Sequence, residues 1–342
     1  MNRVLIKESW EKCLKGFEIT DIALRQKDII YLCARKAMDY DEASDLFDSQ
    51  IPSRLIAIFL YKDPVNNFGS QEITGMNLPV VGVSRPPFPK PSGLLASKDK
   101  DGDTWPAGSG ANGPMEQIAP GKWPHPKRLK CINGFTYSIS TGRDIYKRIA
   151  VGKWVPFRDG FPETREDIWP GYNEMPTSKQ LELSSTLGFN DMDAFSESDM
   201  YAVGGHGDVW HFNGSVWQQM GFPSNVKLST VTCAGDGNVY ISGQGGSLWV
   251  GQQSTWKRIH KGTSTVQWND VLWFKDKLWL ASDYQFRIWN GKELEKVTHN
   301  GEIVYISGNM DVYDGVLAIA SLDAVMTFDG SEWKLIVAPY SS

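Results

Sequence analysis

The second half of the chain repeats itself, and this repetition constrains the fold more than any other feature. Four copies cover residues 190–221, 229–259, 269–297 and 309–337. One shared register, with steps of 39, 38 and 39 residues, holds Trp217, Trp256, Leu294 and Trp333. Sequences with a repeat of this length fold as stacked or radial copies of one supersecondary unit that cannot bury its apolar face alone.

Each copy contains short runs typical of β-strands. In the first copy these are residues 192–195, 200–204, 209–212 and 216–220, separated by turn signals such as Asn213-Gly214. A helical repeat is the competing interpretation, but Gly, Asn or Asp breaks every copy within 5–8 residues. Four strands in a repeat of about 40 residues indicate a blade, so the sequence predicts an all-β fold, a β-propeller with four-stranded blades.

The first half of the chain is less regular. Residues 129–157 read as a blade, and residues 19–34 with 53–61 read as three strands of another. The N-terminal stretch around Trp10 resembles a third and a fourth strand. We therefore expect about six blades, with seven possible if the N-terminal strands belong to a separate blade.

Two stretches interrupt the pattern within what we expect to be one domain over residues 1–342. Residues 63–127 are rich in Pro and Gly and predict a long irregular insertion, and residues 159–188 predict an insertion between blades. Aromatic side chains at exposed loops suit contact with a partner. We therefore expect contact surface at Trp105, Trp123, Trp169 and Tyr172.

The last four copies resemble a generic bacterial β-propeller repeat of the form VYAVG-x-x-G-x-VWH-x-NG-x-x-W, which residues 200–217 follow with Met200 at the first position. The layout is similar to that of WD40 and kelch propellers, but the Gly-His…Trp-Asp pair and the kelch double glycine are missing. The resemblance implies an architecture and no particular function. The chain also resembles the stand-alone propeller-type immunity proteins of bacterial toxin systems, a resemblance that implies a cytoplasmic protein that binds and neutralises one cognate toxin.

Charge and cysteine usage restrict the partners that we expect. The net charge is −5, which disfavours nucleic acid and anionic membranes and favours a protein partner such as a basic toxin domain. The four cysteines form no CxxC pair, and the histidines form no HxH or HExxH pattern, so we expect neither a metal site nor a cofactor. The N-terminus lacks the apolar stretch of a signal peptide, and no run is long enough to span a membrane, so we expect a cytoplasmic protein.

Loops that differ between blades are the best candidates for a binding surface, because the core positions repeat and these do not. They join the second and third strands of successive copies, together with the segments before each first strand. The candidate residues are His206, Gln244, Asp283, Tyr284, Asp323 and Trp268.

Two other functions compete with protein binding. A hydrolase or lyase acting on sugars or lactones would gather carboxylates at the central channel, and Asp191, Asp270 and Asp311 recur near the start of first strands, although turn capping also explains them. A carbohydrate-binding, lectin-like propeller would repeat one site in every blade. The repeat instead replaces Trp by Leu294, and its loops differ.

Overall fold

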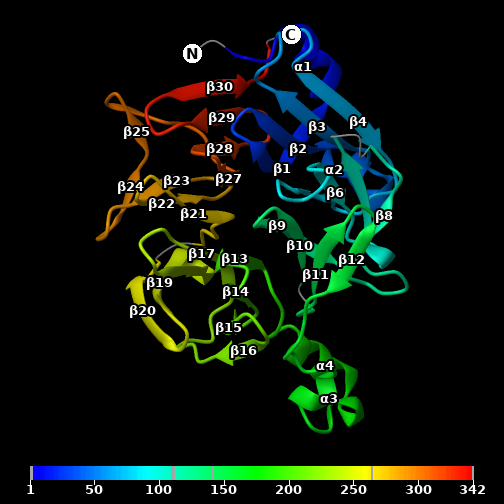
Figure 1. The fold of residues 1–342 in the computed structure, drawn as a ribbon, viewed down its shortest axis with the longest axis vertical. Coiled ribbons are helices and arrows are strands. Elements are labelled where there is room, and N and C mark those ends of the chain that lie inside the picture. The colour runs from blue at the N-terminus through cyan, green and yellow to red at the C-terminus, as the bar shows by residue number, and fades with distance from the viewer. Residues whose placement is uncertain (1–2, 109–111, 141, 263–264, 341–342) are drawn as a thin grey trace.

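Seven four-stranded antiparallel sheets follow one another along the chain and form a ring in a computed structural model (Figure 1). The structure describes residues 3–108, 112–140, 142–262 and 265–340. Blades 1 to 3 consist of β1 (Phe17–Gln26), β2 (Ile29–Lys36), β3 (Ser53–Phe59) and β4 (Phe68–Ile73); β5 (Val80–Val83), β6 (Gly93–Ala96), β7 (Asp103–Ala107) and β8 (Glu116–Gln117); and β9 (Pro126–Ile132), β10 (Phe135–Ser140), β11 (Ile145–Ala150) and β12 (Lys153–Pro156).

Blades 4 to 7 correspond to the four copies of the repeat. They consist of β13 (Asp191–Ser196), β14 (Asp199–Gly204), β15 (Asp208–Phe212) and β16 (Trp217–Met220); β17 (Leu228–Cys233), β18 (Val239–Gly243), β19 (Ser247–Gln252) and β20 (Thr255–His260); β21 (Asp270–Phe274), β22 (Lys277–Ala281), β23 (Phe286–Trp289) and β24 (Leu294–Lys296); and β27 (Asn309–Tyr313), β28 (Val316–Ala320), β29 (Val325–Phe328) and β30 (Trp333–Val337). The predicted all-β propeller with four-stranded blades is therefore confirmed, with seven blades rather than the six that we expected.

The additional blade lies in the stretch that we expected to be an irregular insertion. Residues 63–127 contain β4 and all four strands of blade 2. The prediction of irregularity is wrong because the Pro-rich segment from Arg85 to Pro91 forms the loop between β5 and β6, where proline removes no ladder hydrogen bond. The strands themselves have only two to five residues, too few to show a period in the sequence.

The N-terminal stretch is a helix, α1 (Lys7–Cys13), and not the third and fourth strands that we expected. Its charged residues lie on a helical spacing, with Lys7 and Glu11 paired one turn apart at 4.0 Å. Just before α1, the Leu5 N–H donates to the carbonyl of Ile336 in β30 at 2.9 Å. The two ends of the chain therefore meet at blade 7, while β27 lies against β1 and completes the inner ring.

Apolar and aromatic side chains fill the spaces between blades. Trp217 of blade 4 is 2% exposed and packs with Ile139 and Phe212 in a cluster shared with blade 3. Trp333 of blade 7 is 5% exposed and packs in the same way against Trp279 of blade 6. The recurrent tryptophans are therefore core residues between neighbouring sheets, where their large apolar area contributes most.

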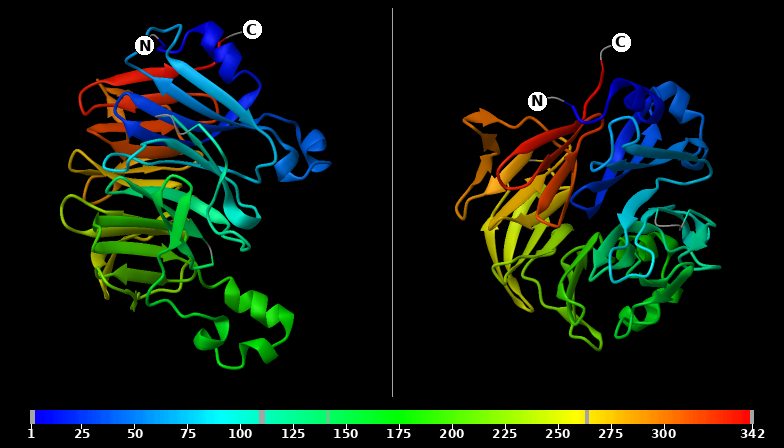
Figure 2. Two further views of the ribbon diagram at one scale, coloured as in Figure 1. Left: turned by 45° about the vertical axis from the view of Figure 1, so that its right-hand side comes forward. Right: turned by 45° about the horizontal axis from the view of Figure 1, so that its top comes forward.

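Each blade sends its loops to two faces of the ring. We call the upper face the one that carries the loops between second and third strands and the links from one blade to the next. The lower face carries the other loops. Residues 159–188 contribute helices to the upper face, and Figure 2 shows them projecting from the same side of the ring as α2. The short elements outside the blades are α2 (Tyr40–Ser44), η1 (Asp48–Gln50), η2 (Lys100–Gly102), α3 (Arg165–Ile168), η3 (Tyr172–Glu174), α4 (Thr177–Ser184), η4 (Gln244–Gly246), β25 (Thr298–His299) and β26 (Glu302–Ile303).

No helix in the described part of the chain has the length and apolar character that crossing a bilayer requires.

Candidate functional site

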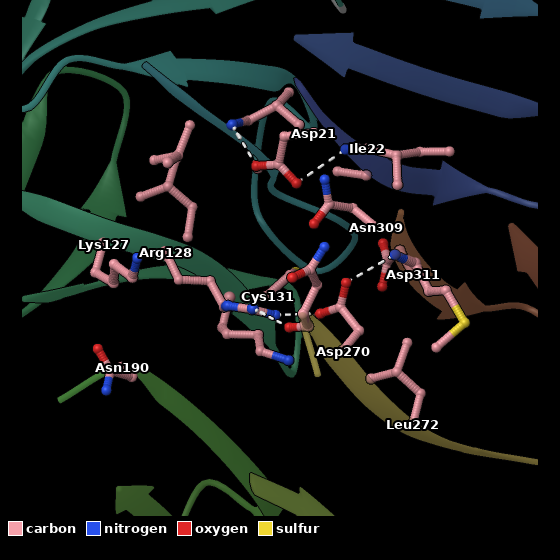
Figure 3. A pocket seen from close by; sticks show the side chains of 18 of the residues that line it. Asp21, Ile22, Lys127, Arg128, Cys131, Asn190, Asp270, Leu272, Asn309 and Asp311 are labelled. Carbon is pink, nitrogen blue, oxygen red and sulfur yellow. Dashed lines mark hydrogen bonds and ion pairs between the residues drawn. The ribbon is translucent and has the colours of Figure 1, made fainter. Parts of the chain in front are cut away.

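The first strands of all seven blades surround a central channel with a volume of about 460 Å³ (Figure 3). Its walls come from β1, β5, β9, β13, β17, β21 and β27, each beside the next around the ring. The lining is polar, and it holds both carboxylates and cations. A channel of this kind is the usual place in a propeller for a ligand or for the tip of a partner.

Arg128 on β9 crosses the upper part of the channel. Its guanidinium forms an ion pair with Asp270 of β21, donates to the Asn269 carbonyl at 2.6 Å, and lies 3.5 Å from Asp191 of β13. Burial opposes the charge, but Asp270 and Asp191 raise the Arg128 pKa. This one side chain therefore joins blades 3, 4 and 6 across the axis.

Aspartates of three inner strands tie blade 4 to blade 5, blade 6 to blade 7 and blade 7 to blade 1. Asp191 accepts a hydrogen bond from the Val231 N–H at 3.1 Å, and Asp270 accepts one from the Met310 N–H at 2.7 Å. Asp311 accepts from the Leu24 N–H at 2.7 Å, which joins blade 7 to blade 1. The recurrence of these residues is therefore explained by contacts between blades, not by the turn capping that we weighed for them.

Two further aspartates lie deeper in the channel and serve the same purpose. Asp21 accepts from the Val81 N–H at 3.0 Å, and Asp193 accepts from the Cys233 N–H at 2.8 Å. Burial raises the pKa of each to about 6, against the opposing pull of Arg128 on Asp21 and of Lys130 on Asp193. The middle of the channel is thus a poor environment for additional negative charge.

Near the lower end of the channel lies an arginine that is held by its neighbours. Arg85 donates to the Leu24 carbonyl at 2.9 Å, lies 3.0 Å from an oxygen of Asp311, and stacks 3.8 Å above the Tyr313 ring. All these partners belong to blades 1 and 7. The lower end is therefore held together by polar contacts made within the protein itself.

The upper mouth is different, because Lys98 and Lys127 line it and Lys227 lies near Lys127 on the same face. Lys98 follows β6, Lys127 lies at the start of β9, and Lys227 precedes β17. Burial lowers the Lys127 pKa, and the nearby charges of Lys98, Arg128 and Lys227 lower it further. We call Lys98, Lys127 and Lys227 the lysine cluster.

Exposed aromatic side chains gather on the upper face. Tyr40, Tyr284 and Tyr305 are each 86% exposed, and Phe47 is 79% exposed, which makes them the most exposed large apolar residues in the described chain. All four lie in loops between second and third strands or in links between blades. Exposed tyrosines grouped on one face are typical of a surface that binds another protein.

Five of the sequence-predicted binding residues lie on this face. His206, Gln244, Asp283, Tyr284 and Asp323 are exposed in the loops of blades 4 to 7. Trp268 does not join them, because its side chain is only 3% exposed and its indole N–H donates to the Gly246 carbonyl at 3.2 Å. Trp268 therefore packs in the core beside the channel and supports blade 6.

The aromatic residues predicted from the two insertions lie in separate places. Trp123 is 61% exposed on the upper face and stacks on His125 with 5.5 Å between the rings. Trp105 is half-buried in β7, against the core between blades 1 and 2. Trp169 and Tyr172 stack on each other at 5.7 Å, and the Tyr172 hydroxyl lies 2.8 Å from Ser184 Oγ in α4, so this pair holds the helical segment together.

Sequence reasoning missed the lysine cluster, Arg128 and three of the most exposed aromatics, Tyr40, Phe47 and Tyr305. The aromatics had an available signal, because they lie in polar stretches such as Asp39–Asp48 that cannot be strands. The lysines had none, since only the closure of the ring brings three distant blades to one mouth.

The geometry offers no evident metal centre. Within the described ranges, no three His, Cys, Asp or Glu side chains lie close enough together to hold a metal ion. The four cysteines are free thiols, and burial raises the pKa of Cys13 and of Cys33 to about 12, which makes these two poor nucleophiles.

Comparison with known proteins places this geometry in context. No protein-family model matches the chain. Its sequence is 27% identical over 208 residues to the immune protein Tsi7 of Pseudomonas aeruginosa, covering 61% of this chain and 63% of that protein. The match therefore spans less than two thirds of the relative's own length.

Solved structures resemble the chain in fold. YCF48 from Cyanidioschyzon merolae has a TM-score of 0.54 at 11% identity, covering 95% of this chain and 96% of that one. YCF48 bound to D1 peptide has a TM-score of 0.52 at 11% identity, covering 95% and 93%. The WD40 propeller domain of Doa1 has a TM-score of 0.54 at 14% identity, covering 90% of each chain. The chain is thus a seven-bladed β-propeller that shares its fold with WD40 propellers and is similar in sequence to a bacterial immune protein.

Proposed function

We propose that the chain is a non-catalytic immunity protein that binds a cognate toxin domain and blocks it. The observation that carries this proposal is the similarity to the immune protein Tsi7 over 208 residues. A propeller suits the task, because its rigid ring holds many different loops on one face at little entropic cost.

The upper face is the surface that we assign to the toxin. It presents Tyr40, Phe47, Tyr284 and Tyr305 at exposures between 79% and 86%, in loops of blade 1 and blade 6 and in the link to blade 7. Tyrosine adds large contact area with few rotatable bonds, which is why it recurs among the residues that dominate binding energy. The candidate residues His206, Gln244, Asp283 and Asp323 lie in the loops of blades 4 to 7 on the same face and would supply polar contacts.

A basic toxin domain fits the charge at the edge of this face. The segment Asp39–Asp48 around α2 holds five acidic residues and no basic one, and the whole chain has a net charge of −5. Opposite charge accelerates association and disfavours nucleic acid or an anionic membrane as the ligand.

The same proposal places the protein in the cytoplasm, where a toxin that acts inside the cell would meet it. Four free cysteines support a reducing compartment. The absence of catalysis is supported by the channel carboxylates, since Asp191, Asp270 and Asp311 are engaged by backbone N–H groups of the neighbouring blade.

Affinity capture tests the proposal. The tagged protein is incubated with lysate of its native host, and the material that stays bound is identified by mass spectrometry. We expect one stoichiometric toxin domain, and we expect production of that domain to arrest growth unless this chain is produced with it. A captured protein without toxicity, or the absence of any stoichiometric partner, would contradict the immunity function.

Two variants make this experiment specific to the upper face. Replacing Tyr40, Tyr284 and Tyr305 by Ala should abolish both capture and protection. The matched control replaces Tyr61, Val65 and Val151, which lie on the lower face at exposures of 60%, 63% and 40%. The control should behave as the unmodified protein.

A further inference from the structure

The lysine cluster brings positive charge from three blades to the upper end of the channel. Lys98 of blade 2 and Lys127 of blade 3 line the upper mouth of the channel, and Lys227, which precedes β17 of blade 5, lies on the same face close enough for its charge to act on Lys127. Among the described residues, the ammonium groups of these lysines form no ion pair, whereas the nearby cations Arg128 and Lys130 are paired with channel aspartates.

The neighbouring carboxylates offset this charge only in part. Burial lowers the Lys98 pKa and the charges of Asp21 and Asp48 oppose that shift, whereas the charges that act on Lys127 are all positive. Asp270 is engaged by Arg128 and by the Met310 N–H, and Asp191 is engaged by Lys130 at 3.4 Å and by the Val231 N–H. Asp99, next to Lys98 in sequence, accepts hydrogen bonds from the Ser97 hydroxyl and the Asn77 N–H instead. The mouth therefore keeps an excess of positive charge in a protein whose net charge is −5.

Holding like charges together costs stability, so an arrangement of this kind is best satisfied by an anion from outside. The burial that lowers the Lys127 pKa shows that water screens this mouth incompletely, which strengthens attraction to an incoming carboxylate. Arg128 lines the same channel next to Lys127, and its ion pairs with Asp270 and Asp191 hold its own charge.

We propose that the lysine cluster binds the carboxylate side chains of a short acidic segment of the partner protein, which enters the upper mouth of the channel. This inference rests on the proposed function and names the chemical groups of the partner that would contact the lysine cluster. The partner is thus basic where it faces Asp39–Asp48 and acidic where it enters the central channel. Two contacts of opposite charge allow the partner to bind in only one orientation on a ring of similar blades.

A protein carboxylate fits better than nucleic acid. Asp283 and Asp323 are exposed on the same face, and the acidic segment around α2 borders it, so an extended polyanion would meet repulsion along most of its length. A nucleic-acid site needs a basic stripe, and this cluster consists of one confined mouth.

Fluorescence anisotropy with a labelled hexaglutamate peptide tests the inference without any toxin. The triple variant Lys98→Gln, Lys127→Gln, Lys227→Gln should bind the peptide at least about tenfold more weakly than the unmodified protein at low salt. The matched control changes Lys257, Lys292 and Lys296 to Gln. These residues are exposed, lie away from the mouth in blades 5 and 6, and carry the same total charge. The control should stay within about twofold.

Further arms separate the alternatives. Changing the three lysines of the cluster to Arg should retain binding. The triple Gln variant should melt no lower than the unmodified protein, because it removes like charges that repel one another. Absence of hexaglutamate binding, equal binding by the triple Gln variant, or tighter binding of a labelled hexathymidine oligonucleotide through the same lysines would each overturn the inference.

Repeating the affinity capture with the triple Gln variant separates this inference from the proposed function. If the unmodified protein captures a toxin and the variant captures it equally well, the function stands and the site is wrong. If no toxin is captured but hexaglutamate binds through the cluster, the site stands and the immunity function is wrong.

Discussion

The two faces of the ring are built by the same strands but offer very different surfaces. The upper face displays tyrosines at 86% exposure and an unpaired lysine cluster, whereas the most exposed large apolar residues of the lower face are Val65 and Tyr61, at 63% and 60%. Near the lower end of the channel, the Arg85 guanidinium is held by the Leu24 carbonyl of blade 1 and by Asp311 of blade 7. The difference shows that the repeated scaffold supplies rigidity, while one set of loops has acquired the features of a binding surface.

The largest expected effect compares the two arginines of the channel. Arg128→Met leaves Asp270 without its cation at 4% exposure, and Asp191 with Lys130 alone, so the free energy of unfolding should fall by about 3–5 kcal/mol. Arg85→Met removes the partner of Asp311, which is 26% exposed and keeps its backbone donors, so the loss should be less than half as large. Urea unfolding followed by tryptophan fluorescence measures both, and equal losses would contradict this account of the channel.

The second prediction puts a number on the contrast between the faces. Replacing Tyr40, Tyr284 and Tyr305 by Ala should weaken binding of the captured toxin domain by about 100-fold, because buried interface tyrosines each contribute about 1–2 kcal/mol. Replacing Tyr61, Val65 and Val151 should change the Kd by less than about twofold. Isothermal titration calorimetry gives both values, and a larger loss in the lower-face variant would reverse the assignment of the faces.

The third prediction concerns the middle of the channel. Burial raises the Asp193 pKa from 3.8 to about 6, so the folded state favours the protonated carboxyl. Its contribution to stability is present below pH 3.8 and is lost as the pH rises through about 6. The difference in unfolding free energy between the unmodified protein and Asp193→Asn should therefore decline by about 2 kcal/mol over this range. A difference that stays constant, or grows with pH, would show that water enters the channel to this depth.

The smallest expected effect tests whether the upper loops are free to bind. Asp283 accepts a hydrogen bond from the Asn269 amide at 2.6 Å, but the pair is exposed. Asp283→Ala should lower the free energy of unfolding by less than about 0.5 kcal/mol. Thermal unfolding of this variant, compared with that of Asp323→Ala, checks the prediction. A large loss of stability would mean that the loop stabilises the fold and is not available to a partner.

Sequence reasoning succeeded where the blades repeat and failed where one blade is short. The register of Trp217 and Trp333 identifies blades 4 to 7, because each tryptophan has to fill the same space between neighbouring sheets. Blade 2 escapes the pattern because its fourth strand, β8, has only two residues and its first loop is proline-rich. The sequence of α1 was mistaken for strands because the position of Trp10 matches the tryptophan position of the repeat.

The candidate site was predictable only in part. Loops that differ between blades point to Asp283 and Tyr284, which the structure places on the upper face at high exposure. Trp268 is an aromatic residue just before a first strand, as the prediction required, but residues of neighbouring strands bury it. The sequence alone does not show which strands lie next to it. The lysine cluster depends on the proximity of residues about 100 apart in sequence, such as Lys127 and Lys227, which only ring closure creates.

Hydrogen–deuterium exchange of the protein with and without its captured toxin domain tests the central claim most directly, because it maps the bound face without any substitution. We predict protection of residues 37–52, 97–99, 205–207, 283–285 and 304–308, all on the upper face, with exchange at residues 61–67, 151–152 and 213–216 unchanged. Protection of the lower loops, or of the outer strands β20 and β24 alone, would contradict the assignment of the upper face as the toxin-binding surface.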